Sequence, residues 1–243
     1  MLTLFRNLFA PPRHMILLVI AAWVGLAFAE KRAERHGIDK DDLNNIAFYG
    51  LIAFIIGGRI SFVLQNFAAF IKSPLGIVSI NPDLFDPPGA LAAALIISLI
   101  YGQRRGLQLW STLDALTPFF GILAIGMGLT RLAAGTAFGK ITDLPWGIEL
   151  WNATRHPTQI YETLAAFIIF GWLWRRRQSP HPGILFLAFS ALTAFSQLVI
   201  ETFRADSTLI LNGLRQEQLL AWAVLVICFI TIESRMKAIK EEG

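Results

Sequence analysis

The chain has 243 residues, of which 55% are hydrophobic and 16% are charged, and its formal net charge is +4. Soluble domains average about 45–50% apolar and about 25% charged residues, so this composition argues against a soluble enzyme and excludes a disordered chain. The basic residues are spread between apolar segments and form no single patch, which argues against a nucleic-acid binder.

Seven apolar segments recur along the chain, and most are long enough to cross a bilayer as a helix. They cover residues 14–29, 45–71, 89–102, 107–129, 158–174, 183–203 and 216–233. The first segment also has features of a signal peptide, because Arg6 and Arg13 precede it, but its cleavage site is only passable, which favours a retained helix. We therefore predict an all-α, polytopic integral membrane protein with about seven transmembrane helices in a single domain, residues 1–243.

Compact clusters of basic residues follow the first, third and fifth apolar segments and occupy the C-terminal tail. They are Lys31, Arg32, Arg35 and Lys40; Arg104 and Arg105; Arg175, Arg176 and Arg177; and Arg235, Lys237 and Lys240. With seven spans these clusters fall on one side of the membrane, and such clusters mark the cytoplasmic side. The charges therefore predict an N-terminus outside the cell, a C-terminus in the cytoplasm and an extracytoplasmic loop at about 136–157.

The single cysteine, Cys228, lies in an apolar run. It excludes an intramolecular disulfide and a cysteine-based metal cluster, and a buried, inert thiol is its simplest interpretation. The sequence shows no spacing typical of metal ligands, so we expect neither a metal nor another cofactor.

Ionisable residues in or beside the apolar segments are costly, at about 2.5–3.5 kcal/mol each at a helix centre, so they need partners or a polar cavity. Asp114 lies near the predicted inner end of its segment. The residues that can lie in the outer half of the bilayer are Arg59, Arg131, Glu162, Glu201 and Arg204. Interhelical ion pairs or snorkelling would explain each one singly. Together they predict a polar cavity for an anionic phospholipid headgroup, because guanidinium groups match phosphate geometry.

The predicted extracytoplasmic loop carries polar and aromatic side chains in two distinctive strings. The first is GKITDLPWG at 139–147, with Asp143 and Trp146, and the second is RHPTQIYE at 155–162. Trp146 is also typical of the interfacial aromatic belt. His156 has two interpretations that the sequence leaves open, an interfacial residue or a group that transfers a proton.

These two strings resemble the corresponding loop of the bacterial prolipoprotein diacylglyceryl transferases, which reads G-K/R-x-T-D-L-P-W-G and then R-H-P-S/T-Q-L-Y-E. The likeness extends over about residues 45–225. It includes FYG at 48–50, GGRISFVL at 57–64, RRG at 104–106, DALTP at 114–118, ETFRAD at 201–206 and QEQLL at 216–220. The family also has seven spans with an outer N-terminus, which agrees with the orientation that the charges predict.

The resemblance implies an integral, multi-pass transferase of the bacterial cytoplasmic (inner) membrane, with its site facing the outer leaflet. It would move a diacylglyceryl group from phosphatidylglycerol, or another anionic phospholipid, to the lipobox cysteine thiol of a prolipoprotein signal peptide, without nucleic acid. The candidate substrate-binding residues are Arg59, Arg131, Asp143 and Arg204, and the candidate catalytic residues are His156, Tyr161, Glu162 and Glu201. The arginines would hold the phosphate, the glutamates and the tyrosine would orient them, and the histidine is the candidate for proton transfer.

The chain departs from the family pattern at several motif positions. Pro88 stands where the family has the histidine of an HGG motif, and Gly128, Thr136 and Gln197 replace an arginine, a glutamate and a second arginine. Arg131 follows Gly128 by three residues on roughly the same helix face, so it is a candidate replacement. The departures leave open a non-catalytic paralogue that binds anionic phospholipid or lipoprotein precursors. A transporter or channel has only the intramembrane charges in its favour.

Overall fold

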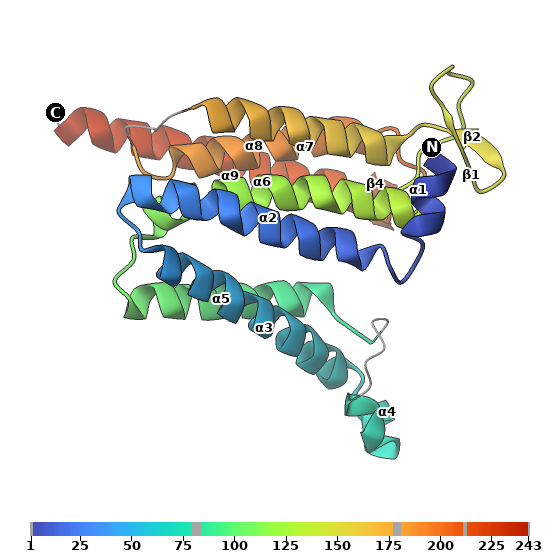
Figure 1. Cartoon of the computed structure of the whole chain (residues 1–243), viewed down its shortest axis with the longest axis horizontal. Helices are drawn as coiled ribbons and strands as arrows, with labels where there is room; N and C mark the ends of the chain where they lie inside the picture. The colour runs from blue at the N-terminus through green and yellow to red at the C-terminus, as the bar shows by residue number, and fades with distance from the viewer. Residues whose placement is uncertain (1, 79–83, 177–180, 211–212, 243) are drawn as a thin grey trace. The chain divides into compact units, whose positions relative to one another are not determined.

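The computed structural model describes residues 2–78, 84–176, 181–210 and 213–242, with side chains up to Lys237. Arg177 and the side chain of Lys240, both in the basic clusters above, lie outside the described residues. The chain divides into two compact units (Figure 1). Unit 1 comprises Met1–Arg32 and Leu113–Gly243, and unit 2 comprises Ala33–Thr112. Each unit is described by itself, and the single domain stays a prediction.

All seven predicted apolar segments are helical (Figure 1), which confirms the all-α prediction. The corresponding helices are α2 (Met15–Ala33), α3 (Lys40–Gln65), α5 (Pro87–Arg104), α6 (Leu109–Ala134), α7 (Thr158–Arg175), α8 (Ile184–Glu201) and α9 (Gln216–Glu242). Shorter helical elements are α1 (Leu2–Leu8), α4 (Phe67–Lys72), and the 3-10 helices η1 (Glu34–His36) and η2 (Pro74–Val78).

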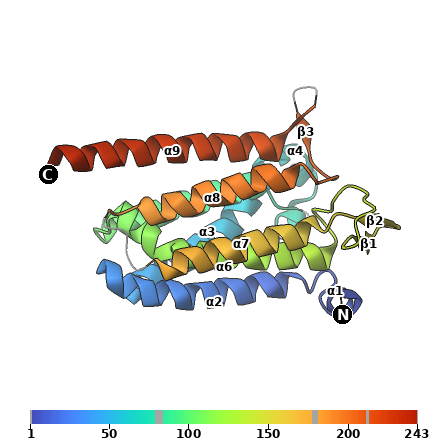
Figure 2. The same cartoon turned by 90° about the horizontal axis from the view of Figure 1, so that it is seen from above.

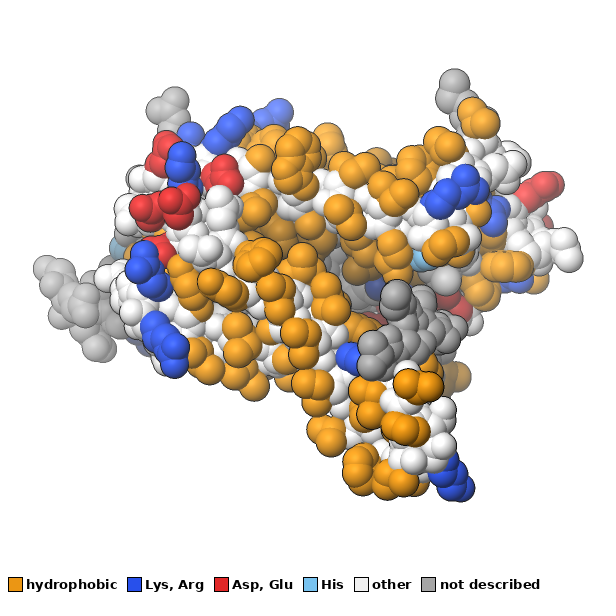
Figure 3. Space-filling view, turned by 60° about the horizontal axis from the view of Figure 1, so that its bottom comes forward, with side chains coloured by type: hydrophobic (Ala, Val, Ile, Leu, Met, Phe, Trp, Pro, Cys, Tyr) orange, Lys and Arg blue, Asp and Glu red, His pale blue; other side chains and the backbone are white. Residues whose placement is uncertain are grey.

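Within the described part of the chain, four helices are long and apolar enough to cross a membrane: α3, α6, α8 and the Gln216–Lys237 part of α9. Helices α2, α5 and α7 are only 18 or 19 residues long and include polar residues at one end. Hydrophobic side chains cover much of the face shown in Figure 3. Large apolar side chains exposed on the helices include Leu95, Phe167 and Trp222. Such a surface is unfavourable in water and suits a hydrocarbon environment. The total of seven spans and their orientation stay predictions.

The predicted segment 45–71 is not one continuous helix. Helix α3 ends at Gln65, and Asn66 has φ −115° and ψ 28°, outside the helical range. The Asn66 side-chain amide donates to the carbonyl oxygen of Phe62 at 2.9 Å, and α4 begins at Phe67. A side chain that bonds the backbone in this way competes with helix propagation, which explains the break inside an apolar run.

Within unit 2, α3 and α5 pack closely against each other through glycines. A Cβ atom at Gly57 would lie 2.2 Å from the Cβ of Ala93, and one at Gly58 would lie 2.8 Å from the Cβ of Ala90. Real Cβ atoms do not approach so closely, so glycine at 57 and 58 allows this contact.

Unit 1 contains two short β-hairpins beside its helices. Strands β1 (Ile148–Leu150) and β2 (Ala153–Arg155) pair antiparallel, with Leu150 opposite Ala153. The two residues at the tip, Trp151 and Asn152, have φ values of 55° and 57°, as a tight hairpin turn requires. Strands β3 (Leu209–Ile210) and β4 (Leu214–Arg215) form the second hairpin, directly before α9. The hairpins therefore flank the helix ends that carry the candidate site.

Asp114 has its partners at the start of another helix. Its side chain is buried in α6, where Oδ2 accepts a hydrogen bond from the amide of Gly183 at 2.6 Å and Oδ1 accepts one from the amide of Phe186 at 2.8 Å. The first amides of a helix have no intrahelical acceptor, and a carboxylate there also interacts favourably with the helix dipole. Asp114 therefore fixes the start of α8 against α6.

We expect Asp114→Ala to lower the free energy of unfolding by about 1–3 kcal/mol, because buried α8 amides lose their acceptor. A thiol-reactive fluorophore reports unfolding of the detergent-purified protein, since the single cysteine, Cys228, is buried in the folded chain. Asp41→Ala is the control, because Asp41 is exposed in the first turn of α3 and its loss should change stability by less than about 0.5 kcal/mol. Equal unfolding temperatures for the two variants would contradict the capping role.

Candidate functional site

The candidate site lies in unit 1, where α6 and α8 end and α7 and α9 begin (Figures 1 and 2). Nη1 of Arg131, in the last turn of α6, lies 2.9 Å from Oε2 of Glu162 on α7. The Glu162 side chain is 9% exposed, whereas that of Arg131 is 35% exposed. Arg131 is therefore held by a nearly buried carboxylate and is still accessible to a ligand.

Close packing of α6 and α7 accounts for the glycine at position 128. A Cβ atom at Gly128 would lie 2.3 Å from Oγ1 of Thr163 on α7. An arginine at this position would collide with α7, whereas Arg131, three residues later, reaches Glu162 without that collision. The packing thus explains the glycine at position 128, and replacement of the motif arginine by Arg131 stays a prediction.

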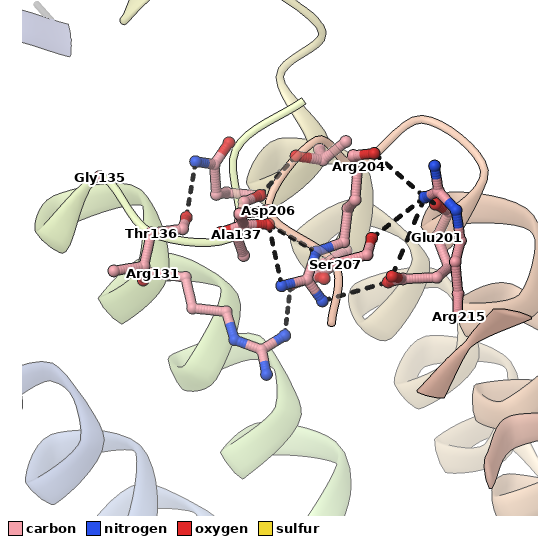
Figure 4. Close-up of polar contacts among 12 residues, drawn as sticks. Arg131, Gly135, Thr136, Ala137, Glu201, Arg204, Asp206, Ser207 and Arg215 are labelled. Carbon is pink, nitrogen blue, oxygen red and sulfur yellow. Dashed lines mark hydrogen bonds and ion pairs between the residues drawn. The ribbon is translucent and has the colours of Figure 1, made fainter. Parts of the chain in front are cut away.

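A second charged cluster follows the end of α8 (Figure 4). Glu201 is fully buried, and its Oε2 lies 3.2 Å from Nη1 of Arg204. Asp206 lies at the same distance from Nη2 of Arg204. Burial lowers the pKa of Arg204, but the charges of Glu201, Asp206 and Glu162 outweigh it, so the pKa lies above its ordinary value. The guanidinium stays charged, and its interaction with Glu162 links this cluster to Arg131.

Arg215 joins the same cluster, although no sequence pattern selects it. Its Nη1 donates to the carbonyl oxygen of Arg204 at 3.0 Å and to Oγ of Ser207 at 3.1 Å. The same nitrogen donates to the carbonyl oxygen of Glu201 and lies 4.0 Å from Glu201 Oε1 (Figure 4). The β3–β4 hairpin turns the chain back and brings Arg215 to the end of α8, which a pattern of single residues does not reveal.

The predicted loop is tied to the chain after α8 by backbone hydrogen bonds. The amide of Lys140 donates to the carbonyl oxygen of Phe203 at 2.8 Å, and the amide of His156 donates to that of Lys140 at 2.9 Å. Gly139 sits between these partners, where an added Cβ atom would lie 2.3 Å from the carbonyl oxygen of His156. The glycine thus permits three backbone segments to lie together beside Arg204.

We expect Gly139→Ala to destabilise this loop by about 1–3 kcal/mol, because the methyl group meets backbone atoms that cannot move aside. Trypsin cleavage after the exposed Lys140, followed by mass spectrometry, measures the effect and should become faster. Gly171→Ala, on α7, is the control, since a Cβ atom there meets nothing within 4 Å. Cleavage at the same rate in both variants would contradict the steric account.

An aromatic cluster surrounds His156. Nε1 of Trp146 donates to the hydroxyl of Tyr161 at 2.9 Å, and that hydroxyl lies 3.5 Å from Nδ1 of His156. The rings of His156 and Phe203 pack with centroids 5.1 Å apart. The rings of His156 and Tyr161 both pack near Phe203, which directly precedes Arg204 in the chain. A histidine ring beside a hydroxyl group has the chemistry of a general acid or base.

Two fully buried residues at the start of α7 hold this arrangement, and the sequence analysis does not select them. Oγ1 of Thr158 donates to the carbonyl oxygen of Ala137 at 2.6 Å, and Nε2 of Gln159 donates to that of Thr136 at 2.8 Å. They fasten the beginning of α7 to the chain that follows α6. Both belong to the RHPTQIYE string at 155–162, and their place one turn before Glu162 is the signal that could have identified them.

Two predicted substrate-binding residues have different surroundings. Arg59 belongs to unit 2, where Nε donates to the carbonyl oxygen of Ile77 at 3.1 Å and Nη1 donates to that of Leu84 at 2.5 Å. Nη2 donates to the carbonyl oxygen of Gly76, so backbone acceptors engage all three nitrogens. Asp143 is exposed in the loop and makes no side-chain hydrogen bond with the described residues. Substrate binding by these two residues stays a prediction.

The remaining departures from the motif pattern are accommodated locally. Pro88 lies in the first turn of α5, where a missing backbone N–H removes no intrahelical hydrogen bond. Thr136 contributes its backbone carbonyl to Gln159. Gln197 is partly buried on α8, one helical turn before Glu201. Ion pairing, one of the two interpretations of the charged residues, is confirmed for Arg131 with Glu162 and for Arg204 with Glu201, while the polar cavity stays a prediction.

Comparisons with a family model and with individual relatives point to the same family. The family model described as prolipoprotein diacylglyceryl transferase matches residues 13–233. The phosphatidylglycerol–prolipoprotein diacylglyceryl transferases of Brucella anthropi and Brucella ovis are each 28% identical over 174 residues. These alignments cover 67% of this chain and 61% of each relative, so the chain spans less than two thirds of the length of these relatives.

Proposed function

The chain belongs to the prolipoprotein diacylglyceryl transferase family, and from this premise we propose that it transfers a diacylglyceryl group from phosphatidylglycerol to the lipobox cysteine of a prolipoprotein. One observation carries the proposal. Arg131 and Arg204 come from different segments, and each is paired with a carboxylate, Glu162 or Glu201, at the same end of unit 1. The ring of His156 packs against Phe203, the residue directly before Arg204. The cluster thus combines cations for a phosphate with a group that can accept a proton.

The proposed reaction exchanges one bond for another. The thiol sulfur attacks the glyceryl carbon that carries the phosphate oxygen, a carbon–sulfur bond forms, and the carbon–oxygen bond breaks. Glycerol phosphate leaves with the bonding electron pair, and the thiol proton passes to a base. A free thiol has a pKa near 8.5, so at neutral pH the reaction needs help to supply the thiolate.

The residues of the cluster match the requirements of these steps. Arg131 is accessible, and its fork-shaped guanidinium can donate two parallel hydrogen bonds to a phosphate. Arg204 stays charged and is held in place by its carboxylates, so it can stabilise the negative charge that develops on the leaving group. His156, with the hydroxyl of Tyr161 at 3.5 Å, is the candidate to accept the thiol proton.

We also propose seven spans, with the site at the outer leaflet of a bacterial inner membrane. In unit 1 the basic ends of α2 and α7, with Lys31, Arg32 and Arg175, lie at the opposite end from the site (Figures 1 and 2). Basic clusters mark the cytoplasmic side, so this arrangement supports an extracytoplasmic site. A prolipoprotein would reach such a site from the outer half of the bilayer.

A transfer assay tests the proposed activity. Purified protein is mixed in detergent with phosphatidylglycerol and a peptide carrying one lipobox cysteine, and mass spectrometry measures the peptide. We expect a diacylglyceryl adduct on the thiol and no adduct on the matched peptide with serine in place of cysteine. Lack of adduct, beside a positive control from a relative with the complete motifs, would refute the activity and favour the non-catalytic alternative, which the relatives do not support.

A further inference from the structure

The guanidinium of Arg204 is engaged by two carboxylates. These contacts reduce the positive charge and the N–H donors that remain for an anionic ligand. Glu201 and Asp206 each lie 3.2 Å from its guanidinium. Glu201 is fully buried, and its second oxygen, Oε1, accepts no hydrogen bond from the described residues. A buried carboxylate without a further counter-charge would hold Arg204 tightly and would repel a phosphate.

Arg215 is the second cation beside that carboxylate. Its Nη1 lies 4.0 Å from Glu201 Oε1, close enough for electrostatic attraction but too far for a hydrogen bond. Backbone carbonyls of Glu201 and Arg204, together with Oγ of Ser207, fix this nitrogen in place (Figure 4). The side chain is 20% exposed, so its charge is only partly screened by solvent.

We propose that Arg215 is a positioning residue that neutralises Glu201 and so leaves Arg204 available to the phosphate of the lipid donor. This inference rests on the proposed function. Within the ion-pair cluster, the arginines Arg131, Arg204 and Arg215 pair with the carboxylates Glu162, Glu201 and Asp206. Without Arg215, this ion-pair cluster has one more negative than positive charge, which disfavours an anionic headgroup.

Arg215→Gln should weaken phosphatidylglycerol binding about tenfold, corresponding to about 1.4 kcal/mol, while kcat changes less than about threefold. Native mass spectrometry of phosphatidylglycerol retention measures binding without the peptide, and the transfer assay supplies KM and kcat. Arg215→Lys keeps the charge and should bind almost as the unaltered chain does. Lys237→Gln, an exposed position later on α9, is the control and should bind unchanged.

Removal of one carboxylate tests whether Arg215 acts through its charge or only by holding the backbone in place. Adding Asp206→Asn to Arg215→Gln should restore most of the binding, because the excess negative charge is removed. Asp206→Asn in the unaltered chain should tighten binding, which keeps the inference testable even if Arg215→Gln does not fold. Unchanged binding in Arg215→Gln, or a loss that neither Arg215→Lys nor Asp206→Asn restores, would overturn it.

The two readouts also separate this inference from the proposed function. A chain that retains phosphatidylglycerol but forms no thioether would refute the transferase activity, and the binding comparison at Arg215 would still decide the inference. A chain that forms the thioether equally well with and without Arg215, at low as well as high lipid concentration, would refute the inference alone.

Discussion

Arg204→Ala is expected to abolish detectable diacylglyceryl transfer and to lower the free energy of unfolding by about 3–5 kcal/mol. The variant removes the cation that lies 3.2 Å from the fully buried carboxylate of Glu201, and breaking such a pair leaves a charge that water cannot reach. It also removes a guanidinium that the proposed mechanism needs at the leaving phosphate. Adduct formation and Cys228 labelling during heating measure the two effects.

A paired variant tests the reason for the stability loss. Glu201→Gln together with Arg204→Gln removes both buried charges. This double variant should recover a large part of the lost stability, because no unpaired charge is left buried. The double variant should not recover diacylglyceryl transfer. Recovery of transfer in the double variant, or an unfolding temperature unchanged by Arg204→Ala, would contradict the account.

Arg131→Ala is expected to lower kcat/KM for transfer about 10²–10³-fold, the usual effect of removing one donor that stabilises developing charge. Stability should fall by no more than about 1 kcal/mol, because the side chain is 35% exposed and solvent screens its pair with Glu162. Steady-state kinetics with varied phosphatidylglycerol measure the change. This result would establish Arg131 as the functional replacement for an arginine at Gly128.

Two variants serve as controls for Arg131. Arg131→Lys keeps the positive charge but loses the forked donor geometry, so its rate should fall between those of the unaltered chain and Arg131→Ala. Arg105→Gln removes an arginine that pairs with Asp42 within unit 2, at 2.7 Å, and should leave transfer unchanged. Full activity in Arg131→Ala would rule out the displaced-arginine explanation.

The helices could be predicted because apolar runs of membrane length have few alternative structures. The break at Asn66 could not, since apolar residues continue on both sides and only the side-chain contact with Phe62 shows where α3 stops. The hydrogen bonds of Asp114 could not be predicted either, because its partners are backbone amides at Gly183 and Phe186, far along the sequence.

Part of the charged cluster could be predicted from the sequence. The three-residue spacing of Glu201 and Arg204 predicts that they share a helix face. The two residues do pair, although α8 ends at Glu201 and Arg204 lies beyond it. The contacts of Arg59 could not be predicted, since its acceptors are carbonyl groups that any residue provides. Arg215 was missed because its contact with Glu201 depends on the β3–β4 hairpin.

We propose that this chain transfers a diacylglyceryl group although several of its motif positions differ from the family pattern. The most direct test counts two products in one reaction of the unaltered protein, the thioether-linked peptide by mass spectrometry and the released glycerol phosphate by enzymatic assay. The account predicts equal amounts of both, and dependence on the peptide thiol. Release of glycerol phosphate without a thioether, or neither product beside an active relative, would contradict it.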